Sequence, residues 1–160
     1  KLENQLWIYS PSADRVMQIS GHMLRQSVMG SDMSYEDMMN DSPLLERYNV
    51  EVGGEEIIDG RQCWLLILTA IKEDVNYFTQ KLWVDQERYV PLKMDLFAKS
   101  GKLLKRTTLS NVQKIQSRWF PMEMVYKDML KDGKGTKLTV LSIQFDIAIP
   151  AGIFNKANLK

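Results

Sequence analysis

The stretch "WFPMEMVYKDMLKDGKGTKLTV", residues 119–140, shows most directly how this chain folds. In it Met122, Met124 and Tyr126 alternate with charged residues such as Glu123. Successive side chains of a β-strand point to opposite faces, so this alternation predicts a strand with one apolar and one charged face. The D-G pair and the second glycine that follow supply a turn to another strand. The stretch therefore predicts a β-hairpin.

Strand and turn patterns continue on both sides of this hairpin. Residues 5–20 read as two short strands around the turn "SPSAD", and Asp59-Gly60 is a strong two-residue hairpin signal between residues 55–58 and 62–71. A further bend is expected at Ser100-Gly101. The regular spacing predicts eight or nine antiparallel strands in a meander.

The end of the chain carries the same alternation. Leu141, Ile143, Phe145, Ile147 and Ile149 occupy every second position, which predicts that they line one side of a long last strand.

Helix signals occur only in the opening part of the chain. Ser34 followed by Asp37 has the spacing of a capping box, and Ser42 before Pro43 is a second start signal. We expect two short helices there. A single antiparallel sheet with one apolar face needs a cover, and these helices are the candidates to provide it.

Length and composition limit the classes of protein to consider. A chain of 160 residues with 44% apolar residues is long enough for one domain over residues 1–160. The net charge is +1 and charges of both signs are scattered, which argues against a nucleic-acid partner. No window reaches the ~18 apolar residues that a membrane-crossing helix needs.

The residues that could carry chemistry form no recognised constellation, so we expect no enzyme, no metal and no cofactor. His22 is the only histidine, and no G-x-S-x-G motif accompanies it. The acids between Asp32 and Asp41 lack calcium-loop spacing, and "GKGT" lacks the phosphate-loop frame and lies between two strands. Cys63 is the only cysteine and is expected to be a buried strand residue.

Several segments, taken in order, carry a family resemblance across nearly the whole chain. They are "LWIYSPSADRVMQISG", "QSVMGSDMSYEDM", "DGRQCWLLIL", "YFTQKLWVDQERYVPLKMDLFAKSGKLLK", "RWFPMEMVYKDMLKDGKGTKLTV" and "IPAGIFNKANL". Together they resemble the outer-membrane lipoprotein-sorting protein family of the LolA superfamily. The resemblance implies a mainly β, α+β fold: a strongly curved antiparallel sheet that forms an unclosed half-barrel, roofed by helices.

The resemblance also implies a function. It implies a periplasmic carrier or chaperone that binds acyl chains of lipoproteins or other lipids in an apolar groove for outer-membrane sorting, with an inner-membrane transporter and an outer-membrane acceptor as partners. A lipid-responsive periplasmic sensor, or an accessory protein of an inner-membrane exporter, is the alternative. The residues expected to bind lipid are apolar or aromatic: Trp7, Met29, Met33, Tyr35, Met38, Met39, Leu44, Leu45, Trp83, Met94, Met122 and Met124.

The family pattern has further elements ahead of "LWIY": a leader, a long first helix and several strands. We therefore expect this chain to be an N-terminally truncated fragment, with a signal peptide upstream of Lys1. The residue that locks the lid in the family would lie in that part and is not assigned. A concave surface left open by the truncation would be covered by self-association or by a ligand.

Overall fold

The computed structural model describes residues 6–39, 43–73, 75–150 and 152–159. The chain forms two compact units, one of residues 1–41 with 144–160 and one of residues 42–143. Each unit is described by itself. The expectation of a single domain stays a prediction.

The first unit contains the predicted N-terminal hairpin as a sheet of its own. Strands β1 (Leu6–Ser10) and β2 (Arg15–Ile19) pair antiparallel, with Leu6 opposite Ile19. The hairpin is as predicted, but β1 and β2 form a two-stranded sheet separate from the seven-stranded one, so the expectation of a single sheet is wrong. Short 3-10 helices at Pro11–Ala13, Gly21–Arg25, Val28–Gly30 and Lys156–Asn158 complete this unit together with helix α1 (Tyr35–Met39).

The start of α1 is the predicted capping box. The Ser34 amide donates to Asp37 Oδ2 at 2.8 Å, and the Asp37 amide donates to Ser34 Oγ at 3.2 Å. Both bonds satisfy amides that have no partner within the helix, so the spacing predicted the helix start correctly. Helix α2 (Leu44–Arg47) begins after Pro43, which precedes the first helical position instead of filling it. Ser42 lies outside the described residues.

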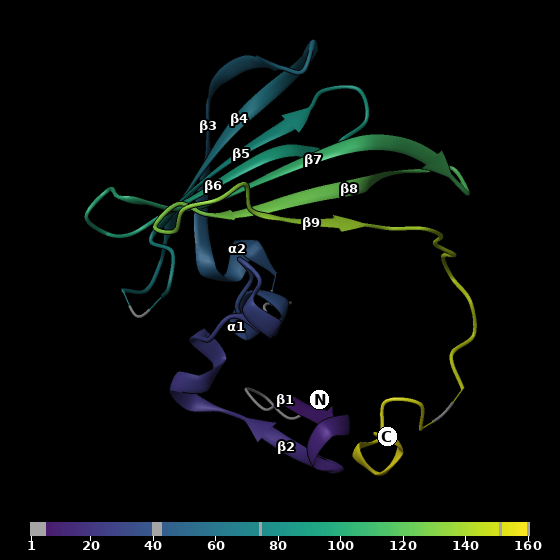
Figure 1. Cartoon of the computed structure of the whole chain (residues 1–160). Coiled ribbons are helices and arrows are strands. Elements are labelled where there is room, and N and C mark those ends of the chain that lie inside the picture. Colours follow the sequence, from purple (N-terminus) through teal and green to yellow (C-terminus); the bar gives the residue numbers. More distant parts are fainter. Residues whose placement is uncertain (1–5, 40–42, 74, 151, 160) are drawn as a thin grey trace. The chain divides into compact units, whose positions relative to one another are not determined.

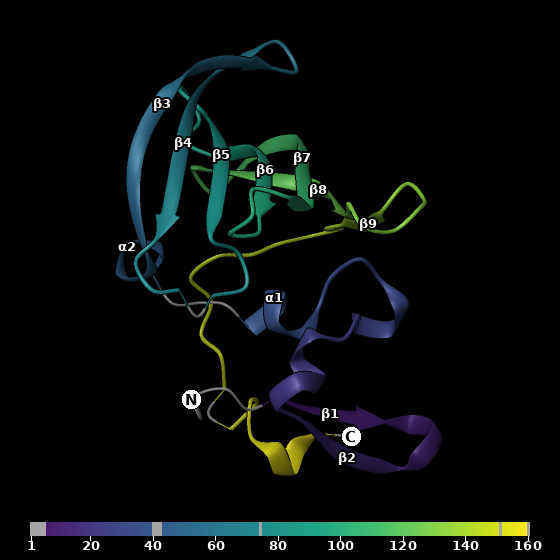
Figure 2. The ribbon, with the colours of Figure 1, turned by 90° about the vertical axis from the view of Figure 1, so that its left-hand side faces the viewer.

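The second unit is built on one antiparallel sheet in the order β3-β4-β5-β6-β7-β8-β9 (Figure 1). The strands are β3 (Tyr48–Ile58), β4 (Arg61–Ala70), β5 (Thr79–Asp85), β6 (Pro91–Phe97), β7 (Leu103–Ile115), β8 (Arg118–Asp128) and β9 (Thr136–Thr139). The sheet is curved and unclosed, with β3 and β9 at its two edges (Figure 2). The predicted open half-barrel sheet is therefore confirmed.

The backbone conformation of a few residues explains where the β3–β4 hairpin turns and where it bends. Asp59 and Gly60 both have positive φ, 49° and 75°, as the tightest hairpin turn requires. Gly53 lies at a register shift in β3, where a Cβ atom would lie 2.5 Å from Cδ1 of Ile67. Only glycine lets the two strands approach this closely at the bulge.

The predicted long last strand is wrong. Strand β9 ends at Thr139, and residues 140–150 form no strand. Leu141, Ile147 and Ile149 are 92%, 57% and 56% exposed, so they line no buried face. Alternation requires a partner strand to become a strand, and β9 pairs only with residues 123–126 of β8.

Two buried clusters hold the second unit together. One contains Cys63, Leu65, Trp83, Val90 and Leu92, and the other contains Tyr48, Leu68 and Ala70. Cys63 is fully buried, as the sequence predicted, and burial raises the pKa of its thiol. Within the described part of the chain, no helix has the length and apolar character to cross a membrane.

Candidate functional site: the apolar face of the seven-stranded sheet

Cross-strand pairing aligns one set of residues across all seven strands. Directly opposed residues share a face, and each member of this set is opposed to the next one along the sheet. The set, called here the apolar row, runs Val52, Leu66, Leu82, Met94, Thr107, Tyr126 and Thr136. Its polar members carry hydroxyl groups only, so the middle of this face has no charged side chain in the row.

The apolar row has apolar neighbours on the same face. Leu109 is opposed to Met124, and Met124 to Leu138, one step along the strands from Tyr126. The Tyr126 hydroxyl donates to Met124 Sδ at 3.3 Å, which shows directly that these two side chains lie on one side of β8. The alternation predicted for residues 122–127 is thus confirmed. Met122 is 7% exposed.

The opposite face has a different composition. A second set of opposed residues, called here the charged row, runs Glu51, Ile67, Lys81, Asp95, Arg106 and Lys127. Arg106 donates twice to the Asp95 carboxylate, at 2.6 and 2.7 Å, while Asp95 is only 4% exposed. The bond to Asp95 raises the pKa of Arg106. This face therefore combines the Asp95–Arg106 ion pair with the buried apolar cluster around Leu65 and Trp83.

Trp83 belongs to the charged side of the sheet. It is opposed to Leu65 and Lys93, while Met94 is opposed to Leu82. Its indole N–H donates to Glu56 Oε2 at 2.8 Å, and the Lys93 ammonium lies 4.0 Å from its ring centroid. The sequence grouped Trp83 with Met94 and Met124 in one lipid-binding set, and the structure does not bring it to their face. The short strand "KLWVD" allowed either register.

The other expected lipid-binding residues lie in the helices and turns before the sheet. Met29 and Met38 are 96% and 61% exposed in the first unit, where Trp7, Met33, Tyr35 and Met39 are partly buried. Leu44 and Leu45, in α2 of the second unit, are 42% and 76% exposed. The predicted roof over the apolar face stays a prediction, because α1 and the sheet belong to different units.

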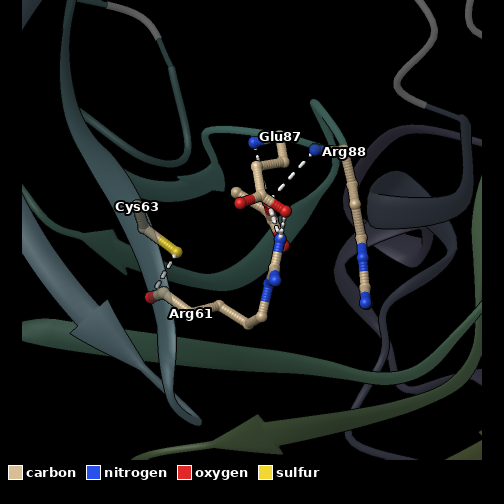
Figure 3. A network of polar contacts seen from close by, with 5 residues as sticks. Arg61, Cys63, Glu87 and Arg88 are labelled. Carbon is tan, nitrogen blue, oxygen red and sulfur yellow. Dashed lines mark hydrogen bonds and ion pairs between the residues drawn. The ribbon is translucent and has the colours of Figure 1, made fainter.

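A polar network that the sequence analysis missed holds one end of the sheet (Figure 3). Arg61 donates to both oxygens of Asp85, at 2.7 and 2.9 Å, and to Glu87 Oε2 at 2.8 Å. The amides of Glu87 and Arg88 also donate to Asp85 Oδ1. These bonds tie the β3–β4 turn to the β5–β6 turn. No local sequence pattern could have paired Arg61 with Asp85, because the two residues are 24 positions apart.

The chemistry of the Asp85 network suits a structural role. The Asp85 side chain is fully buried, and its hydrogen bond from Arg61 lowers its pKa to about 2. A carboxylate held this firmly in its ionised form is a poor proton donor or acceptor near neutral pH. Among the described residues, no three His, Cys, Asp or Glu side chains are arranged to hold a metal ion.

The open curved sheet with one apolar and one charged face is a LolA-like fold. A family model described as "Uncharacterized protein" matches residues 1–160, so the chain belongs to that family. A comparison with curated protein sequences finds no match.

Three solved structures are similar to this chain over nearly its whole length. A DUF1329 family protein from Desulfovibrio piger has 28% identity and a TM-score of 0.88, with 98% of this chain and 65% of that chain covered. An outer membrane lipoprotein-sorting protein domain from Vibrio parahaemolyticus has 28% identity and a TM-score of 0.83, covering 97% and 65%. The LolA superfamily protein NE2245 from Nitrosomonas europaea has 25% identity and a TM-score of 0.64, covering 98% and 68%. The chain thus spans about two thirds of the length of these proteins.

Proposed function

We propose that this chain is the lipid-binding part of a periplasmic carrier for lipoprotein or lipid sorting to the outer membrane. In this proposal, acyl chains lie against the apolar row and its neighbours Met124 and Leu109. The observation that carries the proposal is the seven-strand apolar row on an open sheet whose opposite face is charged. The resemblance in fold to an outer membrane lipoprotein-sorting protein domain supports it.

The chemistry of the apolar row suits an acyl chain. Each buried methylene contributes ~0.8 kcal/mol, so a hydrocarbon chain binds an apolar surface without any polar recognition. Met94 and Met124 add unbranched, polarizable side chains that adapt to chains of different length. The row holds no carboxylate, imidazole or thiol, which supports a binding role over catalysis.

The proposal also includes a lid that opens to release the cargo. The expected lid residues Met38 and Leu45 are 61% and 76% exposed, so they lose few contacts when they move. Elements with few buried contacts open at low cost, and a carrier must open to pass its lipid on. We place Tyr35, Met38 and Met39 in this lid, which exchanges its contacts with the cargo.

Mass spectrometry of lipids that co-purify with the chain tests the proposal. Molecules with acyl chains should be found, and added fatty acid should displace a fluorescent apolar probe from the protein. An empty preparation that also ignores added fatty acid would overturn the proposal. As a matched pair for the probe assay, Met94→Asp should abolish displacement, while Lys93→Gln, on the adjacent residue of the other face, should leave it intact.

A lipid-responsive sensor or an exporter accessory remains the second candidate, because it would use the same apolar face. The two differ in their partners. A carrier passes its lipid to a second carrier or to a membrane, whereas a sensor binds a protein with an affinity that changes with lipid. Transfer of a labelled lipid from the loaded chain to acceptor vesicles supports the carrier. Retention of that lipid, together with lipid-dependent capture of a protein partner, supports the sensor.

A further inference from the structure

We propose that the end of the sheet formed by Arg88, Lys114, Trp119 and Tyr89 docks on the surface of a bilayer that contains anionic phospholipids. This role goes beyond the proposed shelter for acyl chains. It uses the β5–β6 and β7–β8 turns, which lie at the same end of the antiparallel sheet. The phosphate groups of the lipids are the anions that these two cations would meet.

Two positive charges converge on one aromatic ring at this end. The Arg88 guanidinium lies 4.7 Å from the ring centroid of Trp119, and the Lys114 ammonium lies 5.9 Å from it. Lys114 is directly opposed to Trp119 across the β7–β8 hairpin. Trp119 itself packs against the buried cluster around Trp83, so the ring is a fixed platform. The ring attracts both cations, and their two charges make this part of the surface positive, which favours an external anion.

No carboxylate of the described chain pairs with either cation. Several other cations of the second unit do have acidic partners: Arg61 pairs with Asp85, Arg106 with Asp95, and Lys137 with Glu123. Within the described ranges, no ion pair joins a carboxylate to Arg88 or Lys114. Their positive charges therefore remain available to an external anion.

The acidic side chains near Arg88 form ion pairs with another cation, Arg61. Asp85 and Glu87 precede Arg88 in the same turn, and both are bound by Arg61. The backbone amide of Arg88 donates to Asp85 Oδ1, while its guanidinium lies over the Trp119 ring. Asp59 lies in the β3–β4 turn, on the other side of the Arg61 network from the β7–β8 hairpin. The basic side of this sheet end is therefore the side of β7 and β8.

An exposed aromatic residue identifies a bilayer surface, in preference to a free anion, as the ligand. Tyr89 is 73% exposed and directly follows the turn residues 86–88 between β5 and β6, with a positive φ of 55°. Its ring lies 5.9 Å from that of Trp64. Tyrosine and tryptophan favour the headgroup level of membranes, and basic residues beside them bind anionic headgroups. A soluble phosphate would need no exposed tyrosine.

Vesicle co-sedimentation with the full chain tests this site. The wild-type chain should bind vesicles of equal parts phosphatidylglycerol and phosphatidylcholine, and should bind pure phosphatidylcholine vesicles far more weakly. The double variant Arg88→Gln/Lys114→Gln should bind the anionic vesicles about tenfold more weakly or worse. Tyr89→Asn, which tolerates positive φ, should weaken binding by a smaller factor.

A matched control removes the same charge from the opposite end of the sheet. Lys102 and Lys134 are exposed in the β6–β7 and β8–β9 turns, and Lys102→Gln/Lys134→Gln should bind within about twofold of wild type. Equal losses in both double variants would show only a general charge effect and would overturn the proposal. So would wild-type binding that does not depend on phosphatidylglycerol.

Two further readouts separate this site from a free-anion site and from the proposed function. Quenching of tryptophan fluorescence by inorganic phosphate but not by matched chloride, without vesicle binding, would assign a soluble anion site and overturn bilayer docking. The Arg88→Gln/Lys114→Gln variant should keep wild-type displacement of the apolar probe by fatty acid and a wild-type near-ultraviolet circular dichroism spectrum. Loss of vesicle binding with this probe displacement retained supports the proposal, whereas vesicle binding retained in a folded variant contradicts it.

Discussion

The two faces of the seven-stranded sheet are built from neighbouring residues of the same strands and have opposite chemistry. Val52 of the apolar row follows Glu51 of the charged row, Met94 precedes Asp95, and Tyr126 precedes Lys127. The charged face is held by ion pairs and cation–π contacts across the strands. The apolar row has only dispersion contacts and hydroxyl groups, so it gains from an apolar partner that the charged face does not need.

This difference shows what each face contributes. Paired charges such as Asp95 and Arg106 satisfy each other within the sheet, and a charged face does not attract hydrocarbon. In the proposed function, the apolar face binds acyl chains through the apolar side chains of its row. The charged face offers no site for hydrocarbon in this proposal, whereas the apolar face serves both packing and the proposed binding.

The largest expected effect comes from placing a charge on the apolar face. Met124→Asp should lower the free energy of unfolding by about 3 kcal/mol or more and abolish binding of fatty acid, because its carboxylate would face Leu109 and Leu138. Thr108→Asp is the control, since Thr108 is exposed on the other face and should cost within about 0.5 kcal/mol. Urea unfolding and probe displacement measure both effects. Equal effects of the two changes would mean that the faces do not differ as described.

The next largest effect should come from removing an ion pair of the charged face, and it should not change binding at the apolar face. Asp95→Ala leaves the Arg106 guanidinium without its two bonds and should lower the free energy of unfolding by about 2–3 kcal/mol. Glu123→Ala removes the more exposed pair with Lys137 on the same face and should cost less than ~1 kcal/mol. Urea unfolding should show this order, with fatty-acid binding unchanged in both folded variants. Lost binding in a stable Asp95→Ala protein would argue against the division of roles.

Acid should weaken the end of the charged face through Asp85. Its folded-state pKa of about 2 lies below its ordinary value near 4, so its stabilisation is complete above the ordinary value and is lost as the pH falls through about 2. The loss should amount to about 2 kcal/mol and appear in urea unfolding followed from pH 5 to pH 2. Arg61→Gln removes the main cause of the low pKa and should flatten this part of the profile. Parallel profiles for the two proteins would contradict the assignment.

The sequence predicted the sheet better than it predicted the partners of its strands. Turn chemistry at Asp59-Gly60 and the alternation of Met122, Met124 and Tyr126 are local properties, and the structure confirms both. The long last strand failed because alternation indicates faces but does not supply a partner for residues 140–150. The expectation of a single sheet failed for the same reason, because the local pattern does not indicate that β1 and β2 pair with each other apart from the main sheet.

Prediction of the site residues from sequence meets the same limit, because their positions depend on how the strands pair. Met94 and Met124 share a face as expected, whereas Trp83 could be placed only when its opposed residues, Leu65 and Lys93, were known. The Arg61–Asp85 network joins residues 24 positions apart, and no local pattern pairs them. Long-range pairing fixes these positions, and a single sequence carries little direct information about it.

The smallest expected effect concerns α1 and decides whether its methionines belong with the apolar face. Met38→Ala should lower the free energy of unfolding by less than ~1.5 kcal/mol, because Met38 is 61% exposed, and Met39→Ala should behave alike. Leu68→Ala is the contrast, since Leu68 is 1% exposed and should cost the ~2–5 kcal/mol of a buried deletion. If α1 is a lid, both methionine changes should still weaken fatty-acid binding several-fold.

Hydrogen exchange provides an independent measurement of the same lid. Amides of residues 35–39 should exchange fast in the free protein and slow down when fatty acid is added, because a lid gains contacts from its ligand. Amides of residues 123–126, which pair on both sides within the sheet, should stay protected throughout. Equal protection of both segments without ligand, together with full buried-deletion costs for Met38→Ala and Met39→Ala, would make α1 part of a packed core. The apolar face would then lack a lid, and the proposed release step would fail with it.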